Sequence, residues 1–196
     1  MTADAAALFE PGSAPLAHRR TERLALDIPV PADLEELHAL NSDPRVWTHF
    51  PSLRPTRLAQ SQEILDVWRE CWAADGLGSW IVRDRATGEF LGYAGCRVVR
   101  GVFWNLGYRF RPEAQGRGFA TEAARAALDA AHEVHPELPV VAYLVEHNAA
   151  SARVAERLGF TLQHRAPDAG NPDPDVMRLV YADRDLTEAE LAAALG

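Results

Sequence analysis

The chain of 196 residues is long enough to bury a core and fits one α/β domain, or at most two small ones. Its formal net charge of −8 at pH 7 opposes broad electrostatic docking, so we expect neither nucleic acid nor a membrane as a partner. All 20 basic residues are arginines, which excludes chemistry that needs a Schiff-base lysine. Cys71 and Cys96 form no C-x-x-C pair, predict neither a disulfide framework nor a zinc site, and favour a reducing, cytoplasmic location.

Residues 1–20 are expected to form a flexible tail ahead of a single domain over residues 21–196. The tail begins rich in alanine, but Asp4 and Glu10 stand where a signal peptide carries basic residues, and Pro11 interrupts the apolar run. The sequence contains no run of about 18 apolar residues, so no membrane-spanning helix is predicted.

The first half of the domain predicts a strand, two helices and an antiparallel strand meander. Leu24, Leu26 and Ile28 alternate as in a half-buried strand, and Asp33 with Glu36 forms a capping-box pattern ahead of a helix. The predicted elements are a strand over 23–28, helices over 33–40 and 56–75, and strands over 79–83, 90–99 and 102–110.

The second half alternates between helical and strand patterns, which is typical of a βαβ-like arrangement. Its predicted elements are a helix over 121–132, a strand over 140–145, a helix over 149–158, strands over 160–163 and 176–181, and a terminal helix capped by Thr187 and Glu190. The fold class is therefore mixed α/β, with a central, mostly antiparallel sheet of about seven strands flanked by helices.

The segment from Gln115 to Ala123 lies between a predicted strand and a predicted helix that lacks a Ser or Asp cap. Gly116 and Gly118 allow a phosphate to approach the free amides at the helix start, and Arg117 adds positive charge. This pattern indicates an anion site, although a glycine-rich turn whose amides face water remains an alternative.

Asn148 and Ser151 form a second motif, at the start of the helix that ends before Gly159 and Phe160. Asn148 is a good helix cap, and Ser151 lies in the first turn. Taken separately, both residues have a purely structural explanation.

Together the two motifs, Q-x-x-G-x-A and N-x-x-S-x-x-V-x-x-x-L-G-F, resemble those of the GNAT superfamily of acyl-CoA-dependent N-acyltransferases, in its RimJ/RimL-like branch. The resemblance covers roughly residues 20–182. It implies a sheet splayed between the family's fourth and fifth strands, acetyl-CoA as the co-substrate, no metal, and direct acetyl transfer to a primary amine of a small molecule or a peptide N-terminus. A homodimer is also an expectation from the family.

The resemblance places the acetyl-CoA pyrophosphate on the amides of residues 115–120 and the pantetheine beside Phe110 and Arg111. A backbone N–H near Arg109 or Phe110 would polarise the thioester carbonyl. The implied CoA-binding residues are Arg109, Phe110, Arg111, Gln115, Gly116, Arg117, Gly118, Phe119, Ala120, Thr121, Asn148 and Ser151.

Transfer needs a proton donor for the CoA thiolate and a base for the amine. The resemblance assigns the donor role to Ser151, while the glutamate that relatives use as base is missing. The catalytic candidates are Ser151 as donor, and Glu146, His164 or Asp168 as base, with His147, Asp173 and a water chain as further alternatives. Glu122 is better explained as a first-turn residue of its helix, favoured by the helix dipole, than as the base.

The family builds its acceptor pocket from the first two helices, the loop between them and the strand hairpins. Here those segments supply Trp47, His49, Phe50, Trp80, Tyr93, Trp104 and Asn105, and any of the aromatic residues has core packing as its alternative. Asn105 replaces an acidic residue that many relatives carry before the Gly-Tyr pair. His132 and His135 lack a third ligand nearby, so no metal site is predicted there.

Two other functions remain open on sequence grounds. A non-catalytic acyl-CoA sensor on the same fold would explain the missing glutamate. An unrelated phosphate-binding α/β enzyme would require the second motif to arise by chance.

Overall fold

The computed structural model describes residues 16–169 and 171–195, so most of the expected tail lies outside the described residues. Residues His18–Arg20 nevertheless form an edge strand, β1, which pairs antiparallel with β2 (Leu24–Asp27). The sheet therefore starts before residue 21. Because β1 has only three residues, His-Arg-Arg, it carries no apolar alternation that would have predicted it.

The sheet has eight strands where about seven were expected, in the order β1-β2-β3-β4-β5-β6-β8-β7. The remaining strands are β3 (Ser79–Asp84), β4 (Phe90–Val99), β5 (Phe103–Phe110), β6 (Val140–Val145), β7 (Thr161–Pro167) and β8 (Met177–Ala182). All neighbouring pairs are antiparallel except β5 and β6. The prediction of a mixed, mostly antiparallel sheet is confirmed.

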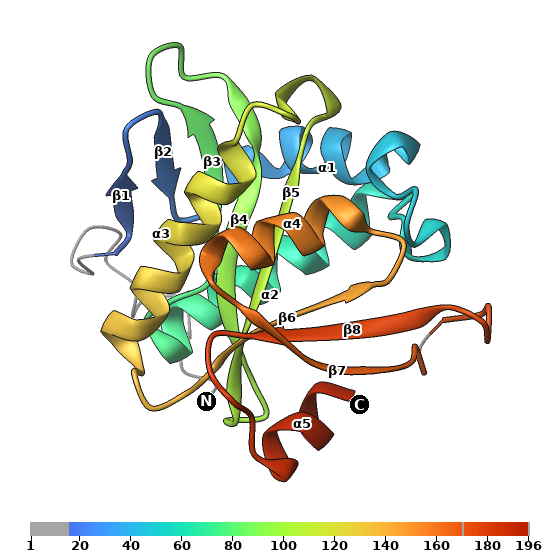
Figure 1. The fold of residues 1–196 in the computed structure, drawn as a ribbon. Helices are drawn as coiled ribbons and strands as arrows, with labels where there is room; N and C mark the ends of the chain where they lie inside the picture. The colour runs from blue at the N-terminus through green and yellow to red at the C-terminus, as the bar shows by residue number, and fades with distance from the viewer. Residues whose placement is uncertain (1–15, 170, 196) are drawn as a thin grey trace, which may run out of the picture.

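Among the residues that the structure describes, five α-helices flank the sheet: α1 (Leu34–Ser42), α2 (Leu58–Asp75), α3 (Phe119–Val134), α4 (Ala149–Leu158) and α5 (Glu188–Leu195). In Figure 1, α3 and α4 lie in front of the sheet, α1 and α2 lie behind it, and α5 lies below β7 and β8. Thr187 and Glu190 form the predicted capping box of α5. The box predicted for α1 does not form, because Asp33 lies in a short 3₁₀ helix (Pro31–Asp33) and accepts from the N–H of Val30.

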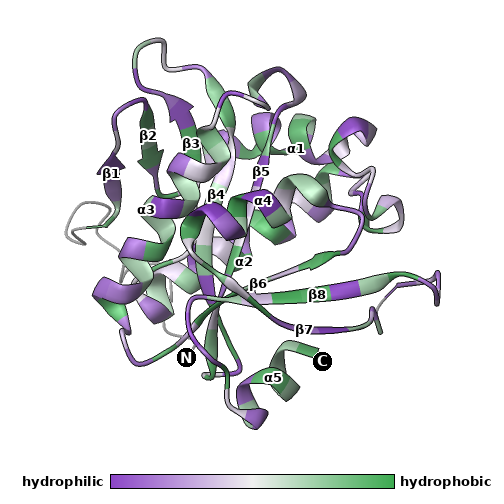
Figure 2. Cartoon of the chain, viewed as in Figure 1, coloured by the Kyte–Doolittle hydropathy of each residue, from purple (hydrophilic) through white to green (hydrophobic). Residues whose placement is uncertain are grey.

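Side chains that alternate along the strands divide the core between the two faces of the sheet. Trp80 and Trp104 belong to the main cluster with α3 and α4, and Ile81 packs with α1 and α2. A third cluster joins Phe103, Val180 and α5. Figure 2 shows α5 coloured mostly as hydrophobic, as expected for a helix that covers an apolar surface.

The parallel strands β5 and β6 are paired only at their N-terminal ends. Trp104 lies opposite Val140 and Asn105 lies opposite Val141, after which the two strands separate, while β6 continues to pair with β8. This separation forms a gap in the middle of the sheet (Figure 1). None of the described helices is long and apolar enough to cross a membrane.

Candidate active site

The edge of β5 that faces the gap carries unpaired backbone groups. Arg111 donates its N–H to Leu91 on the β4 side, at 2.9 Å, and Trp104 donates to Pro139 on the β6 side, at 2.9 Å. Because backbone groups of successive strand residues point in opposite directions, those of Tyr108 and Phe110 face the gap and those of Arg109 face β4. Of the two amides expected to polarise a thioester, only that of Phe110 faces the gap, with Tyr108 as the other candidate.

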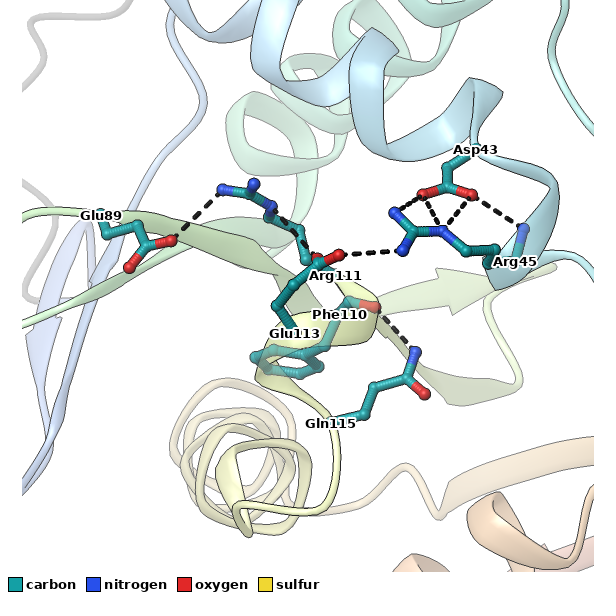
Figure 3. Close-up of polar contacts among 7 residues, drawn as sticks. All are labelled: Asp43, Arg45, Glu89, Phe110, Arg111, Glu113 and Gln115. Atoms are coloured by element: carbon teal, nitrogen blue, oxygen red, sulfur yellow. Dashed lines mark hydrogen bonds and ion pairs between the residues drawn. The ribbon is translucent and has the colours of Figure 1, made fainter.

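The glycine loop leads from β5 into α3 with its amides exposed. Gly116 and Gly118 have φ values of +74° and +82°, in the left-handed region that favours glycine, and α3 begins at Phe119. The amides at the start of a helix have no intrahelical acceptor. Gln115 holds the loop against β5, because its side-chain amide donates to the carbonyl of Phe110 at 3.1 Å (Figure 3).

Charged side chains form a network just before the glycine loop (Figure 3). Arg111 donates to Glu89 at 3.4 Å and lies 3.9 Å from Glu113, and Arg45 bridges Glu113 to Asp43. Arg111 therefore has carboxylate partners of its own. The expected contribution of its charge to an anion site is correspondingly reduced.

A half-exposed ionic contact that the sequence did not predict supports the start of α3. Glu122 accepts from the hydroxyl of Thr21, and from the N–H and side chain of Arg23. Burial opposes ionisation of Glu122, but these hydrogen bonds outweigh it and hold its pKa below the ordinary value. Arg23 also donates to the carbonyl of Arg117 and stacks on the ring of Phe119, so it fixes the glycine loop.

Beside this loop lies a hollow of about 400 Å³ lined by basic, acidic and aromatic side chains. Its lining comprises Glu22, Arg23, Asp84, Arg85, Ala86, Arg117 and Phe119. The guanidinium of Arg117 lies over the Phe119 ring, 4.6 Å from the centroid.

Across the gap, Asn148 caps α4 by accepting from the N–H of Ser151 at 3.1 Å. The hydroxyl of Tyr108 makes a long contact of 3.5 Å with the carbonyl of Ser151. This contact links β5 to the first turn of α4 and brings Ser151 to the gap. Burial raises the pKa of Tyr108, so its phenol stays protonated at neutral pH.

On the α2 face of the sheet lies a hollow of about 410 Å³. Two predicted acceptor residues, Tyr93 and Asn105, line it. Its other lining residues, which the sequence analysis did not select, are Gln60, Glu63, Ile64, Val67, Trp68, Ser79, Gly95, Arg97 and Gly107. Asn105 and Gly107 lie on β5 where it leaves β6, so the hollow opens beside the gap.

The segment between α1 and α2 brings Trp47 and His49 to the same region. The guanidinium of Arg109 lies 3.5 Å from the centre of the Trp47 ring and donates to the hydroxyl of Tyr93. The ring of His49 lies 5.2 Å from that of His147, at the end of β6. Phe50 follows in the same segment and is half-buried.

Trp80 and Trp104 do not line the hollow. Both side chains are fully buried on the opposite face of the sheet, in the core beneath α3. Their indole N–H groups donate to the carbonyls of Leu16 and His135. The expectation that they contact the acceptor is wrong, because both side chains are fully buried in the core, with the Trp80 ring packed 5.5 Å from that of Trp72 in α2.

Of the three principal base candidates, two are held by arginines and the third lies on a distant strand. Arg165 makes two hydrogen bonds to Glu146, at 2.7 and 2.8 Å, which lower the pKa of this exposed carboxyl group. Asp168 is buried and accepts from Arg178 at 2.7 Å. His164 lies on β7, two strands beyond β6.

The further base candidate Asp173 and the two histidines considered as metal ligands have surface or helix-end positions. Asp173 is exposed and accepts from the N–H of Asp175. His132 pairs with Asp183 and His135 with Glu137. Among the described residues, no group of three or more His, Cys, Asp or Glu side chains is arranged to hold a metal ion.

Comparison with known proteins shows the family to which the chain belongs. A family model described as an acetyltransferase (GNAT) domain matches residues 23–161. The uncharacterised protein YkkB of Bacillus subtilis is 34% identical over 124 residues, which are 62% of this chain and 71% of YkkB.

Solved acetyltransferase structures share the fold. One from Agrobacterium tumefaciens is 31% identical, with a TM-score of 0.68, and the match covers 84% of this chain and 93% of that one. The ribosomal-protein α-N-acetyltransferase RimL, solved with coenzyme A, is 19% identical, with a TM-score of 0.70 and coverage of 85% and 96%.

Proposed function

Because the chain belongs to the GNAT acetyltransferase family and is an acetyl-CoA-dependent N-acetyltransferase, we propose that acetyl-CoA lies in the gap between β5 and β6 and that the amine acceptor reaches it from the hollow beside α2. The observation that carries this proposal is the position of Asn105 and Gly107. Both line the hollow, on the strand whose free edge borders the gap.

The donor fits the gap by its hydrogen-bonding groups. The amides of residues 116–121 at the start of α3 offer a site for the pyrophosphate, where the helix dipole favours negative charge. The backbone edge of Leu106, Tyr108 and Phe110 offers strand-like partners to the pantetheine, although the Phe110 carbonyl already accepts from Gln115. The N–H of Tyr108 or Phe110 would then stabilise the oxyanion that develops on the thioester carbonyl.

The acceptor fits the hollow by size and charge. A volume of about 410 Å³ suits a small molecule or the end of a peptide. Its amine arrives as an ammonium, for which Glu63 supplies a counter-charge and Trp68 an aromatic face. Arg97 lines the same hollow, so an acceptor that also carries an acidic group finds partners for both charges.

Ser151 is the proposed proton donor to the leaving thiolate. In the reaction, the neutral amine attacks the thioester carbon, the C–N bond forms and the C–S bond breaks. The Ser151 hydroxyl then gives its proton to the thiolate and takes the remaining extra proton of the nitrogen in exchange. The contact between Tyr108 and Ser151 supports this placement at the gap.

Thiol release from acetyl-CoA tests the proposal across N-terminal peptides, free amino acids, polyamines and amino sugars. We expect release with one class, and Gly107→Val to raise KM for that acceptor at least tenfold with acetyl-CoA affinity unchanged. A Cβ at Gly107 meets no atom within 4 Å, so the added methyl groups enter the hollow without straining the fold.

Ala74→Val, on an exposed position of α2 that does not line the hollow, is the matched control. An unchanged KM in Gly107→Val would contradict the acceptor placement. Stabilisation by CoA without thiol release from any acceptor would contradict the transfer proposal and favour a non-catalytic acyl-CoA sensor.

A further inference from the structure

The segment between α1 and α2 holds polar atoms that the protein itself does not satisfy. Among the described residues, three buried side-chain atoms have no hydrogen-bond partner: Oδ1 and Nδ2 of Asn41 and Nδ1 of His49. Buried polar atoms are paired in most folded proteins, so orphaned ones call for an explanation. Asn41 lies in α1 just before the segment, and His49 lies within it. The segment reaches the hollow through Trp47, because Trp47 stacks on Arg109 and Arg109 donates to Tyr93 of the lining.

This segment reaches both sides of the gap. Trp47 stacks with Arg109 of β5, 3.5 Å from guanidinium carbon to ring centre, and His49 lies against His147, which follows β6, with 5.2 Å between ring centres. Trp47 and His49 are only two residues apart, so the segment spans the mouth of the gap. Because Asn148 and Ser151 follow His147, the histidine pair also lies next to the start of α4.

The proposed transfer requires a base that is neutral at physiological pH and close to the acceptor. Burial lowers the pKa of His49, and the neighbouring His147 lowers it further, so its imidazole is neutral at pH 7. Glu146 and Asp168 are instead held by Arg165 and Arg178. The charged groups around the pair are the ion pair of Glu146 with Arg165 and, through Trp47, the guanidinium of Arg109.

We propose that His49 is the general base that takes a proton from the acceptor ammonium, and that the neighbouring His147 tunes the basicity of His49. This inference rests on the proposed function, because it assigns a residue to the same reaction. The ammonium N–H bond breaks, and the proton moves to an imidazole nitrogen of His49. The freed amine attacks the thioester, and His49 then releases its proton to solvent.

The test compares His49→Gln and His147→Gln with the wild type, using the acceptor identified by thiol release. We expect His49→Gln to lower kcat about 100-fold, the usual size of a general-base contribution, with CoA affinity unchanged. The wild-type kcat should rise with pH through a limb below pH 6.5, because the pKa of His49 lies below that value, and this limb should disappear in His49→Gln.

His147→Gln should retain most of kcat but move the limb to higher pH, because removing a like charge raises the pKa of His49. His135→Gln is the matched control. His135 is also a half-buried histidine, but it lies at the C-terminal end of α3, packed against Trp104. A merely structural role for His49 would change thermal stability and leave the limb in place.

Full kcat and an intact limb in His49→Gln would overturn the proposal while leaving the acetyltransferase activity standing. If His49→Gln does not fold, as judged by loss of its cooperative thermal transition without ligand, His49→Asn serves as the second variant with the same expected limb. A loss of kcat in His147→Gln alone would also overturn the assignment of the base to His49.

Discussion

Asn148 and Ser151 act through different atoms of the same helical turn. The side-chain oxygen of Asn148 accepts from the backbone N–H of Ser151, so the cap does not use the serine hydroxyl. The hydroxyl is therefore available for chemistry, and structural and catalytic effects at this turn can be separated by substitution.

Ser151→Ala should lower kcat about 100-fold through loss of a proton donor, with little change in KM for acetyl-CoA or in Tm. Asn148→Ala should instead cost about 1 kcal/mol of stability, because it removes the cap and keeps the hydroxyl. Steady-state kinetics and thermal melts on both variants check this contrast. Full turnover in Ser151→Ala would remove the hydroxyl from the donor role.

Some residues of the candidate site could be predicted from local sequence patterns, and others could not. Gly116, Gly118 and Asn148 were predicted because a left-handed turn and a helix cap each demand particular residue types. The contact of Arg23 with Glu122 joins positions 99 apart in the chain, and nothing in either neighbourhood indicates its partner. Only the folded sheet brings them together.

The two faces of strand β5 have different surroundings, because side chains alternate along a pleated strand. Trp104 and Leu106 pack into the core beneath α3, whereas Asn105 and Gly107 line the hollow. The sequence carried this signal, because large apolar residues alternate with polar or small ones at period two. Reading that alternation would have assigned Trp104 to the core from the start.

The loop before β8 is fixed by an ion pair that ties it to the C-terminal helix. The side chain of Asp168 is only 3% exposed, and its partner Arg178 also donates to the carbonyls of Ala194 and Leu195 in α5. Removing one member of a buried pair leaves the other charge uncompensated. Asp168 therefore stabilises this corner of the fold.

We expect Asp168→Asn to destabilise the protein by about 3 kcal/mol, and Glu146→Gln, at a solvent-exposed pair, to have a much smaller effect. Thermal or urea denaturation measures the difference. A large loss of kcat in Asp168→Asn with an unchanged Tm would contradict the structural role and restore Asp168 as a base candidate.

Over the whole molecule, the sequence predicted the order of the elements better than their arrangement. Seven strands and five helices carry their own periodicity and turn signals, and the structure contains all of them. No local pattern indicates that β8 inserts between β6 and β7, or that β5 and β6 separate after two paired residues. Those features arise from packing between distant segments, and the splay was expected only through the family resemblance.

Because the gap divides the sheet, CoA should stabilise the fold by binding both halves. At 100 times Kd, a ligand that binds only the folded state adds about 2.7 kcal/mol, which corresponds to a rise in Tm of roughly 5–11 °C for a domain of this size. Differential scanning fluorimetry with CoA measures this rise, and AMP at equal concentration, which lacks the pantetheine, is the control.

Gly118→Ala should reduce that rise. Its φ of +82° strains any residue with a Cβ, and the new atom would lie 3.4 Å from Nη2 of Arg23. An equal rise with CoA and with AMP, or an unchanged rise in Gly118→Ala, would contradict the proposed placement of CoA.

The separation of β5 from β6 also leaves two strand edges inside the molecule, and exposed edges ordinarily recruit strands from other chains. Here the two edges face each other. They converge where Trp104 and Asn105 of β5 pair with Val140 and Val141 of β6, which leaves little room for a second polypeptide. A thin ligand arm with its own amide groups can enter. In the proposed complex, the pantetheine of CoA lies between β5 and β6 like a ninth strand. Product release then requires the hydrogen bonds between the pantetheine and the strand edge to break.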